Sequence, residues 1–200
     1  MLYVVGIGPG NREYILPKAV SILKKCNFIL GFSRAIKSID YIEGEKIIIN
    51  ALENIIDISN EYEESDVAIV ASGDPTFYGI TNYLKKHYLR DIEVIPGISS
   101  FQYLTAKLNM SWNNAFLGSL HGREECFIEN IKSHEISIWL TDKKNNPSKL
   151  CSEIIKESIN CQVIVGENLS YEDEVITRGV PSEFVGNKYS YLSILIVEKL

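Results

Sequence analysis

The fold is decided by a stretch in the first half of the chain, Val67-Ala68-Ile69-Val70-Ala71-Ser72-Gly73-Asp74-Pro75-Thr76-Phe77-Tyr78-Gly79. A short β-branched run that ends in Gly-Asp-Pro is typical of a buried strand that opens into a sharply turned loop. Gly73 permits close approach of the backbone, Asp74 offers a hydrogen-bond acceptor, and Pro75 fixes φ. Because ligands of open α/β sheets bind beyond the carboxyl ends of strands, this loop is a candidate binding element.

Two more loops of this kind follow predicted strands. Gly6-Ile7-Gly8-Pro9-Gly10 comes after a strand at 2–6, and Pro96-Gly97-Ile98-Ser99-Ser100 comes after a strand at 92–95. Taken singly, each loop has a plain structural reading, either as a tight connection or as a helix capped by Asp74, Ser99 or Ser100. Three such loops on the strand ends of one sheet predict a site.

The apolar pattern alternates between strand and helix through the first half of the chain. It predicts strands at 2–6, 27–30, 46–49, 67–71 and 92–95, with helices near 14–25, 34–40, 52–63, 76–88 and 98–108. Such alternation favours parallel strands joined by right-handed crossovers. We therefore expect an α/β domain over residues 1–109 and a linker at about 109–114.

The second half has fewer helices for its strands. Strands are predicted at 115–119, 136–141, 161–166, 174–178 and 190–198, with helices near 124–132 and 147–159. This pattern favours a mixed, partly antiparallel sheet in a second α/β domain over residues 114–200.

Composition limits the classes of function. The 200 residues are 46% apolar and 23% charged, with a net charge of −6, which is ordinary for a globular protein but argues against nucleic acid as a partner. The apolar runs are too short to span a bilayer, and no signal-peptide pattern is present, so we expect no membrane association. Four cysteines without C-x-x-C spacing favour a reduced, cytoplasmic protein without a bound metal.

The nucleotide-binding motifs do not fit the glycine-rich loops. A dinucleotide fingerprint needs a third glycine or alanine where Asn11 stands, and an acidic residue near the end of the second strand, which instead reads Phe28-Ile29-Leu30-Gly31. No Gly-Lys-Ser/Thr exists for a P-loop. A nicotinamide oxidoreductase is therefore disfavoured, whereas a non-enzymatic nucleotide-binding or scaffold domain stays open.

Together, the three loops resemble those of the tetrapyrrole (corrin and porphyrin) methylases in order and spacing. The resemblance continues in the second half, through Ser119-Leu120-His121-Gly122-Arg123, Leu140-Thr141-Asp142-Lys143 with Pro147, and Gly166-Glu167-Asn168-Leu169-Ser170-Tyr171 with Glu174. These later segments look like the branch that methylates carbon 5 of cobalt-precorrin-7, giving cobalt-precorrin-8, in anaerobic cobalamin biosynthesis. A neighbouring methylase acting at another ring carbon is the alternative.

The resemblance implies two α/β domains with S-adenosylmethionine in a cleft between them, held largely by backbone groups. It assigns Gly73 and Asp74 to the methionine part of the cofactor, with Ser99 and Ser100 beside it. The implied cofactor-binding set is Gly8, Pro9, Gly73, Asp74, Pro75, Ser99, Ser100, Leu117, Leu140 and Thr141. Of these, Leu117, Leu140 and Thr141 would line the adenine and ribose side.

The implied corrinoid substrate carries several carboxylates, which arginine pairs with well. The candidates in the second domain are His121 and Arg123, which are also the candidates for positioning in catalysis, and those in the first are Arg12, Arg34 and Pro9. Each arginine could equally be a solvated surface residue. Since the donor is already activated, the enzyme mainly aligns donor and acceptor, and we expect no nucleophilic triad.

Three further expectations follow from the resemblance. Many members of the family are homodimers, so a homodimer is expected here. Some relatives are fused to a methyltransferase that acts on carbon 15 and removes a carboxyl group, so we expect a separate enzyme to supply that step. Cobalt would enter inside the macrocycle rather than bind the protein.

Overall fold

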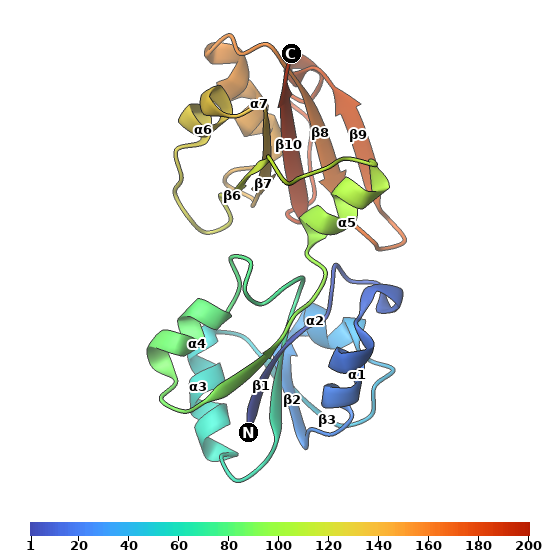
Figure 1. Ribbon diagram of the computed structural model, residues 1–200, viewed down its shortest axis with the longest axis vertical. Helices are drawn as coiled ribbons and strands as arrows, with labels where there is room; N and C mark the ends of the chain where they lie inside the picture. The colour runs from blue at the N-terminus through green and yellow to red at the C-terminus, as the bar shows by residue number, and fades with distance from the viewer. The chain divides into compact units, whose positions relative to one another are not determined.

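The computed structural model describes residues 1–200 and divides them into two compact units, Met1–Ser100 and Phe101–Leu200. Each unit is built on one five-stranded sheet (Figure 1). The predicted fold class, α/β with two α/β units, is confirmed.

The sheet of the N-terminal unit is entirely parallel, with the order β3-β2-β4-β1-β5. Its strands are β1 (Leu2–Gly6), β2 (Phe28–Phe32), β3 (Glu45–Ile49), β4 (Val67–Ala71) and β5 (Ile92–Ile95). Its helices are η1 (Arg12–Tyr14), α1 (Pro17–Leu23), α2 (Ser33–Ser38), α3 (Leu52–Glu61) and α4 (Thr81–His87).

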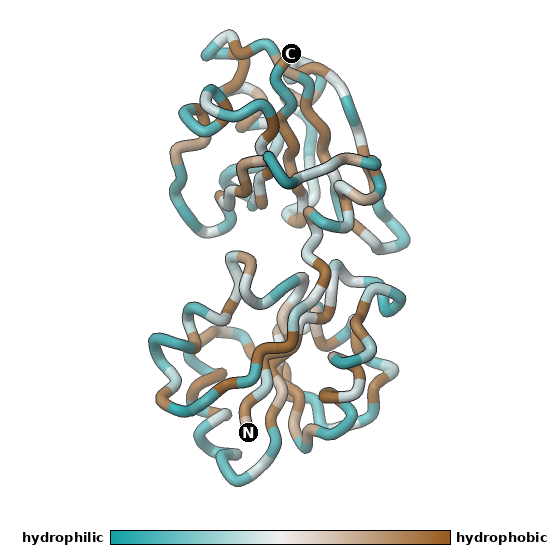
Figure 2. The backbone as a smooth tube through the Cα atoms, in the orientation of Figure 1, coloured by the Kyte–Doolittle hydropathy of each residue, from teal (hydrophilic) through white to brown (hydrophobic).

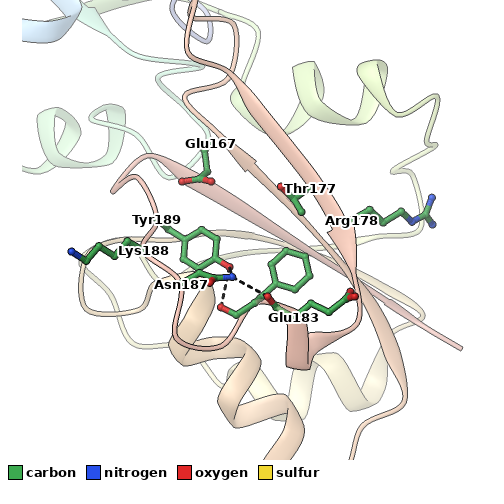
Figure 3. Close-up of a pocket in the computed structure, with 8 residues that line it drawn as sticks. Glu167, Thr177, Arg178, Glu183, Asn187, Lys188 and Tyr189 are labelled. Atoms are coloured by element: carbon green, nitrogen blue, oxygen red, sulfur yellow. Dashed lines mark hydrogen bonds between the residues drawn. The ribbon is translucent and has the colours of Figure 1, made fainter.

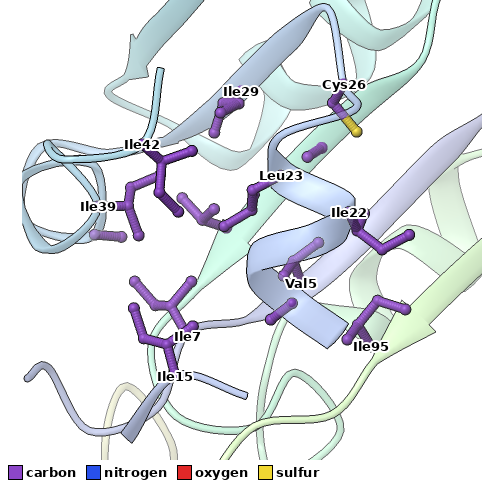
Figure 4. Close-up of a cluster of buried hydrophobic side chains, with 14 of the residues drawn as sticks. Val5, Ile7, Ile15, Ile22, Leu23, Cys26, Ile29, Ile39, Ile42 and Ile95 are labelled. Carbon is purple, nitrogen blue, oxygen red and sulfur yellow. The ribbon is translucent and has the colours of Figure 1, made fainter. Parts of the chain in front are cut away.

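Helices cover both faces of this sheet. Successive strand residues point to opposite faces, so each central strand contributes side chains to two buried clusters. Val5 and Ile29 pack with Leu23 of α1 in one buried cluster (Figure 4). On the opposite face, Val4 packs with Leu84 of α4 in a second cluster. All of these side chains are fully buried, and burial of a side chain of this size contributes about 1.5–3 kcal/mol.

This arrangement places a topological switch point between β1 and β4. The chain leaves β1 toward α1 on one face and leaves the neighbouring β4 toward α4 on the other. At such a point the two connections diverge, and the carboxyl ends of the strands are where open α/β sheets bind ligands. The glycine-rich loops predicted from the sequence follow β1, β4 and β5, which are adjacent strands.

The sheet of the C-terminal unit is mixed, with the order β6-β7-β10-β8-β9. The β6–β7 pair is parallel and the remaining pairs are antiparallel, which confirms the prediction of a mixed, partly antiparallel sheet. Its elements are α5 (Ser100–Lys107), β6 (Phe116–Ser119), α6 (Phe127–Ser133), β7 (Ile136–Leu140), α7 (Pro147–Lys156), β8 (Cys161–Glu167), β9 (Val175–Gly179), η2 (Pro181–Glu183) and β10 (Ser193–Lys199).

The core of the C-terminal unit centres on Trp139, which is fully buried between the rings of Phe116 and Phe127. Its indole N–H donates to Ser137 Oγ over 2.9 Å, so its one polar atom is satisfied. In Figure 2 the strands of both units carry most of the hydrophobic colour, and the connecting loops are paler or hydrophilic.

The linker expected at 109–114 lies inside the C-terminal unit, because the units divide between Ser100 and Phe101. Trp112 of that segment packs edge-on against Phe101 of α5, with ring centroids 5.2 Å apart. In addition, Gly166 of β8 lies so close to Leu104 that a Cβ on the glycine would be 3.1 Å from the leucine side chain. Helix α5 therefore belongs to the C-terminal unit, nine residues before the expected division.

Candidate functional site

The first and second loops are joined directly through their backbones. Gly73 N donates to Gly8 O over 2.7 Å, and Gly8 N donates to Gly73 O over 3.3 Å. Gly8 has φ +75° and Gly73 has φ +68°, a region that glycine enters without the steric cost that other residues meet. The loops predicted separately from the sequence thus form one structure.

The third loop is packed against both of them. A Cβ on Gly97 would lie 2.2 Å from Gly73 O and 2.9 Å from the carbonyl carbon of Gly6. A Cβ on Gly6 would lie 2.6 Å from Gly97 N. Because backbone meets backbone here, only glycine fits at these positions. We call the loops 6–10, 72–79 and 96–100 the three-loop cluster. Mutual packing accounts for these glycines before any ligand is considered.

Asp74 fastens the second loop to the third. Its Oδ1 accepts hydrogen bonds from the backbone N–H of Thr76 (2.7 Å) and from the Thr76 hydroxyl. Its Oδ2 accepts from Gly97 N over 3.3 Å. The carboxylate is therefore a positioning group within the cluster, a role beside the cofactor contact implied by the resemblance.

Helix α4 begins at Thr81, and the prediction of a helix from about residue 76 was wrong. Thr81 N and Thr81 Oγ1 both donate to Pro75 O, over 3.2 and 2.7 Å, which closes residues 75–81 into a turn. Gly79 is required in this turn, because a Cβ there would lie 2.4 Å from the same carbonyl oxygen. Tyr78 has φ +51°, an unfavourable conformation for a large side chain.

The remaining predicted residues of this unit lie around the cluster at different depths. Pro9, Pro75 and Ser99 are buried, and Ser100 is half-buried at the start of α5. Arg12 is exposed in η1, directly after the first loop, and its positive charge acts on Tyr41. Arg34 lies in α2, after β2, which β4 separates from β1 in the sheet. The structure thus places Arg12 next to the cluster in the chain, and Arg34 in the helix that follows a more distant strand.

In the C-terminal unit, the loops after the parallel strands β6 and β7 are tied together by one carboxylate. Asp142 accepts hydrogen bonds from Gly122 N (2.9 Å) and Asn145 N (2.6 Å). Burial alone would raise the pKa of Asp142, but backbone N–H groups, with the nearby His121, hold its pKa below the usual value. We call the loops 119–125 and 140–146 the strand-end pair.

His121 is fixed inside the strand-end pair. Its Nδ1 lies 3.1 Å from Thr141 O, and its backbone N–H donates to Ser119 Oγ over 3.3 Å. Thr141 is buried and its hydroxyl donates to Ser193 O over 2.8 Å. His121 and Arg123 are both exposed. The structure therefore brings His121 and Thr141 together, as two residues predicted on separate segments.

Leu117 and Leu140 lie on one face of the C-terminal sheet. Leu117 of β6 is in register with Ile138 of β7, and Leu140 is two residues further along the same strand. Since alternate residues share a face, the two leucines share it with Ile138. Both are half-buried, and they lie opposite the Trp139 face that α6 and α7 cover.

The sequence model of the family of tetrapyrrole (corrin/porphyrin) methylases matches residues 1–184 of this chain. The chain belongs to this family. A probable cobalt-precorrin-7 C(5)-methyltransferase of Methanocaldococcus jannaschii is 36% identical over 99% of this chain and 98% of its own length.

Two solved structures share the fold of this tetrapyrrole methylase. A precorrin-6Y methylase from Archaeoglobus fulgidus has a TM-score of 0.79 at 24% identity, covering 100% of this chain and 98% of that one. A uroporphyrin-III C-methyl transferase from Thermus thermophilus, complexed with S-adenosyl homocysteine, has a TM-score of 0.77 at 17% identity, covering 98% and 91%.

Sequence reasoning missed a third cluster of this methylase, which joins α5 to the loop after β8. Glu174 accepts from Ser170 N over 2.6 Å and pairs with Lys107 Nζ over 3.3 Å. Burial, together with a hydrogen bond to Glu174, raises the pKa of Tyr103 to about 12. The sequence indicated only one side of this cluster. Glu174 belongs to a segment that carries the family resemblance, whereas its partners on α5 belong to none.

Two buried thiols of the methylase, those of Cys26 and Cys151, are poor nucleophile candidates. Burial raises the pKa of Cys26 to about 11 and that of Cys151 to about 12, which keeps both protonated. No group of three or more His, Cys, Asp or Glu residues is arranged to hold a metal ion. None of the helices has the length and apolar content that a membrane crossing needs.

A hollow of about 410 Å³ lies elsewhere in the C-terminal unit, against β8 and β9 (Figure 3). Its polar side chains are engaged by nearby backbone: Glu167 accepts from Ser190 N, Glu183 accepts from Val180 N, and Tyr189 donates to Phe184 O. In Figure 3, Arg178 points away from the Tyr189 ring. None of the predicted site residues lines it, so it does not belong to the candidate site.

Proposed function

We propose that this chain is an S-adenosylmethionine-dependent methyltransferase of cobalamin biosynthesis that methylates carbon 5 of cobalt-precorrin-7 to give cobalt-precorrin-8. One observation carries the proposal: identity to the C(5)-methyltransferase of M. jannaschii extends over nearly the whole of both chains. The match therefore covers the C-terminal unit, whose segments resemble this branch, as well as the loops common to the family.

The three-loop cluster fits a cofactor held by main-chain groups. Gly6, Gly8, Gly73 and Gly97 pack the three loops together through their backbones, so peptide groups from three neighbouring strand ends meet where open α/β sheets bind ligands. No acidic residue ends β2, where a ribose clamp would stand. When bound, S-adenosylmethionine supplies a methyl group already activated by the sulfonium charge.

This chain's own residues then supply position and charge. Asp74 keeps the second and third loops at a fixed separation, and Pro9 borders the first loop. We propose that Arg123, with Arg12 and Arg34, pairs with the acetate and propionate groups of the corrinoid. Leu117, Leu140 and Thr141 stay proposed contacts of the adenosine part, and the homodimer and the separate carbon-15 enzyme stay proposals as well.

The decisive experiment combines the protein with cobalt-precorrin-7 and S-adenosylmethionine labelled with ¹³C in the methyl group. NMR of the product is expected to show the label on carbon 5. Label on another ring carbon would favour the neighbouring methylase activity. Tight binding of S-adenosylhomocysteine by calorimetry without any transfer would favour a binding domain instead.

Arg123→Ala tests the carboxylate assignment separately. We expect the KM for the corrinoid to rise about tenfold, the equivalent of about 1.4 kcal/mol, with binding of S-adenosylhomocysteine unchanged. Arg178→Ala is the matched control, since Arg178 is an exposed arginine of the same unit that pairs with Glu198 over 2.6 Å. An unchanged KM in Arg123→Ala would contradict the assignment.

A further inference from the structure

Methylation of carbon 5 releases a proton, and the proposed function does not say what accepts it. Carbon 5 of a tetrapyrrole bridges two rings and carries one hydrogen within the conjugated system. Replacing that hydrogen by a methyl group leaves one proton to be removed. General-base catalysis of such a step contributes about 10²–10⁴-fold when a base is held in place.

The structure fixes the orientation and the tautomer of one exposed imidazole at the strand-end pair. Thr141 O can only accept, so the 3.1 Å contact places the ring hydrogen of His121 on Nδ1. The other nitrogen, Nε2, then carries a lone pair and is a proton acceptor. His121 contacts Thr141, which the resemblance assigns to the adenosine side of the site. The sequence predicted these two residues on separate segments.

The surroundings of His121 suit a ring that gains a positive charge. The carboxylate of Asp142 is held beside His121, because it accepts a hydrogen bond over 2.9 Å from the backbone N–H of the next residue, Gly122. This carboxylate is fixed by Gly122 N and Asn145 N, on both sides of the strand-end pair. A fixed negative charge near an imidazole stabilises the protonated ring.

We propose that His121 is the general base of this reaction and accepts the carbon-5 proton on Nε2; the inference rests on the proposed function. The bond from carbon 5 to the methyl group forms as the bond from sulfur to methyl breaks, with its electron pair leaving on sulfur. The electron pair of the C–H bond returns to the conjugated ring, and the proton passes to His121. No oxidant, reductant or metal is needed for this balance.

The other two histidines stand in different surroundings. His134 has a similar backbone contact, with Nδ1 2.8 Å from Asn130 O, but its ring packs against Phe116 and it precedes β7. His87 lies at the end of α4 with its ring against Tyr83. His134 is therefore the matched control, as a histidine of the same unit with the same kind of anchor but at the opposite end of β7.

The test compares His121→Ala, His121→Gln and His134→Gln with the wild-type protein in single turnovers, with hydrogen or deuterium at carbon 5. We expect both His121 variants to lose about 10²–10⁴-fold in the rate at which the deprotonated, methylated product forms and to keep their affinity for S-adenosylhomocysteine. A deuterium isotope effect should appear or grow in them, because proton loss becomes slow. Added imidazole should partly restore His121→Ala, and His134→Gln should match the wild type.

Two results would overturn the inference, and they are distinguishable. A wild-type protein that binds S-adenosylhomocysteine but transfers no methyl group to cobalt-precorrin-7 overturns the proposed function and this inference with it. Formation of the deprotonated, methylated product at the wild-type rate in His121→Ala, without an isotope effect, overturns the inference alone. Since His121 is exposed, circular dichroism of the variants should match that of the wild type.

Discussion

The three-loop cluster and the strand-end pair both hold loops together, but they do so through different kinds of contact. Both join loops that follow neighbouring parallel strands. In the first, glycine backbones touch one another, as Gly73 touches Gly8 and Gly97. In the second, the loops are held by the side chains of Asp142 and His121. The first is therefore sensitive to added volume, and the second is sensitive to lost charge and lost hydrogen bonds.

The largest effect is expected from adding one methyl group to the three-loop cluster. Gly97→Ala places a Cβ 2.2 Å from Gly73 O, so the loops must separate. Overpacking against backbone should lower the free energy of unfolding by about 3 kcal/mol and weaken S-adenosylhomocysteine binding at least tenfold. Urea unfolding and calorimetry measure the two effects.

Gly186→Ala is the control for that substitution. Gly186 has φ +83°, but a Cβ at this position would have no atom within 4 Å. An alanine there would therefore be strained in its backbone conformation without clashing with a neighbour. We expect a loss of about 1 kcal/mol and unchanged ligand binding. Equal losses in the two variants would mean that close approach does not govern the cluster.

A smaller effect is expected from removing one charge in the strand-end pair. Asp142→Asn should lower the free energy of unfolding by about 1 kcal/mol, since the carboxylate is partly exposed but accepts two backbone hydrogen bonds. It should also raise the KM for the corrinoid by loosening His121 and Arg123, while S-adenosylhomocysteine binding changes little.

The pH dependence of this variant has a definite sign. The pKa of Asp142 is lower in the folded protein than in the unfolded chain, so the stabilisation is fully present above the unfolded value of about 4. It disappears as the pH falls through the folded pKa. The difference between wild type and Asp142→Asn in urea unfolding should therefore shrink below about pH 4, and a difference that stays constant would exclude the charge as its cause.

The smallest effect is a gain in stability within the three-loop cluster. Tyr78→Gly removes the cost of a large residue at φ +51°, about 1–2 kcal/mol, and the greater freedom of glycine in the unfolded chain returns part of it. We expect a net gain of about 0.5 kcal/mol in urea unfolding. Ser158→Gly, at φ +52° after α7, should gain a similar amount. A loss in Tyr78→Gly alone would mean that its ring packs the loop.

Most of the fold could be predicted because the strands are short apolar runs bounded by turn residues. The run Val67–Ala71 and the loop after it show their roles within a dozen residues, and β4 has the predicted bounds. Helix α4 starts five residues late, because a side-chain bond from Thr81 to Pro75 O holds a turn where helical spacing continues. The competition between this turn and the helix depends on the hydrogen-bond geometry of a few residues, and the apolar periodicity of the sequence does not reveal it.

The candidate site was predictable to the extent that its residues are local. The glycines of the three-loop cluster are visible in the sequence, although their contact with each other is not. Asp142 stood in a quoted segment, but its partner Gly122 lies on another strand end, so its positioning role needed the structure. The division between the units was misplaced for the same reason: Leu104 of α5 packs near Gly166, far along the chain.

The reciprocal hydrogen bonds between Gly8 and Gly73, with Gly97 packed beside them, have a consequence for biosynthesis. Their partners are distant in sequence, and contacts of that kind form slowly because long loops must close first. A nascent chain that has emerged only as far as α4 has two of the three loops and no β5 to complete the sheet edge. The third loop ends at Ser100 of 200 residues, so the cluster can be assembled only after half of the polypeptide has left the ribosome. The first unit therefore cannot be completed before the midpoint of translation.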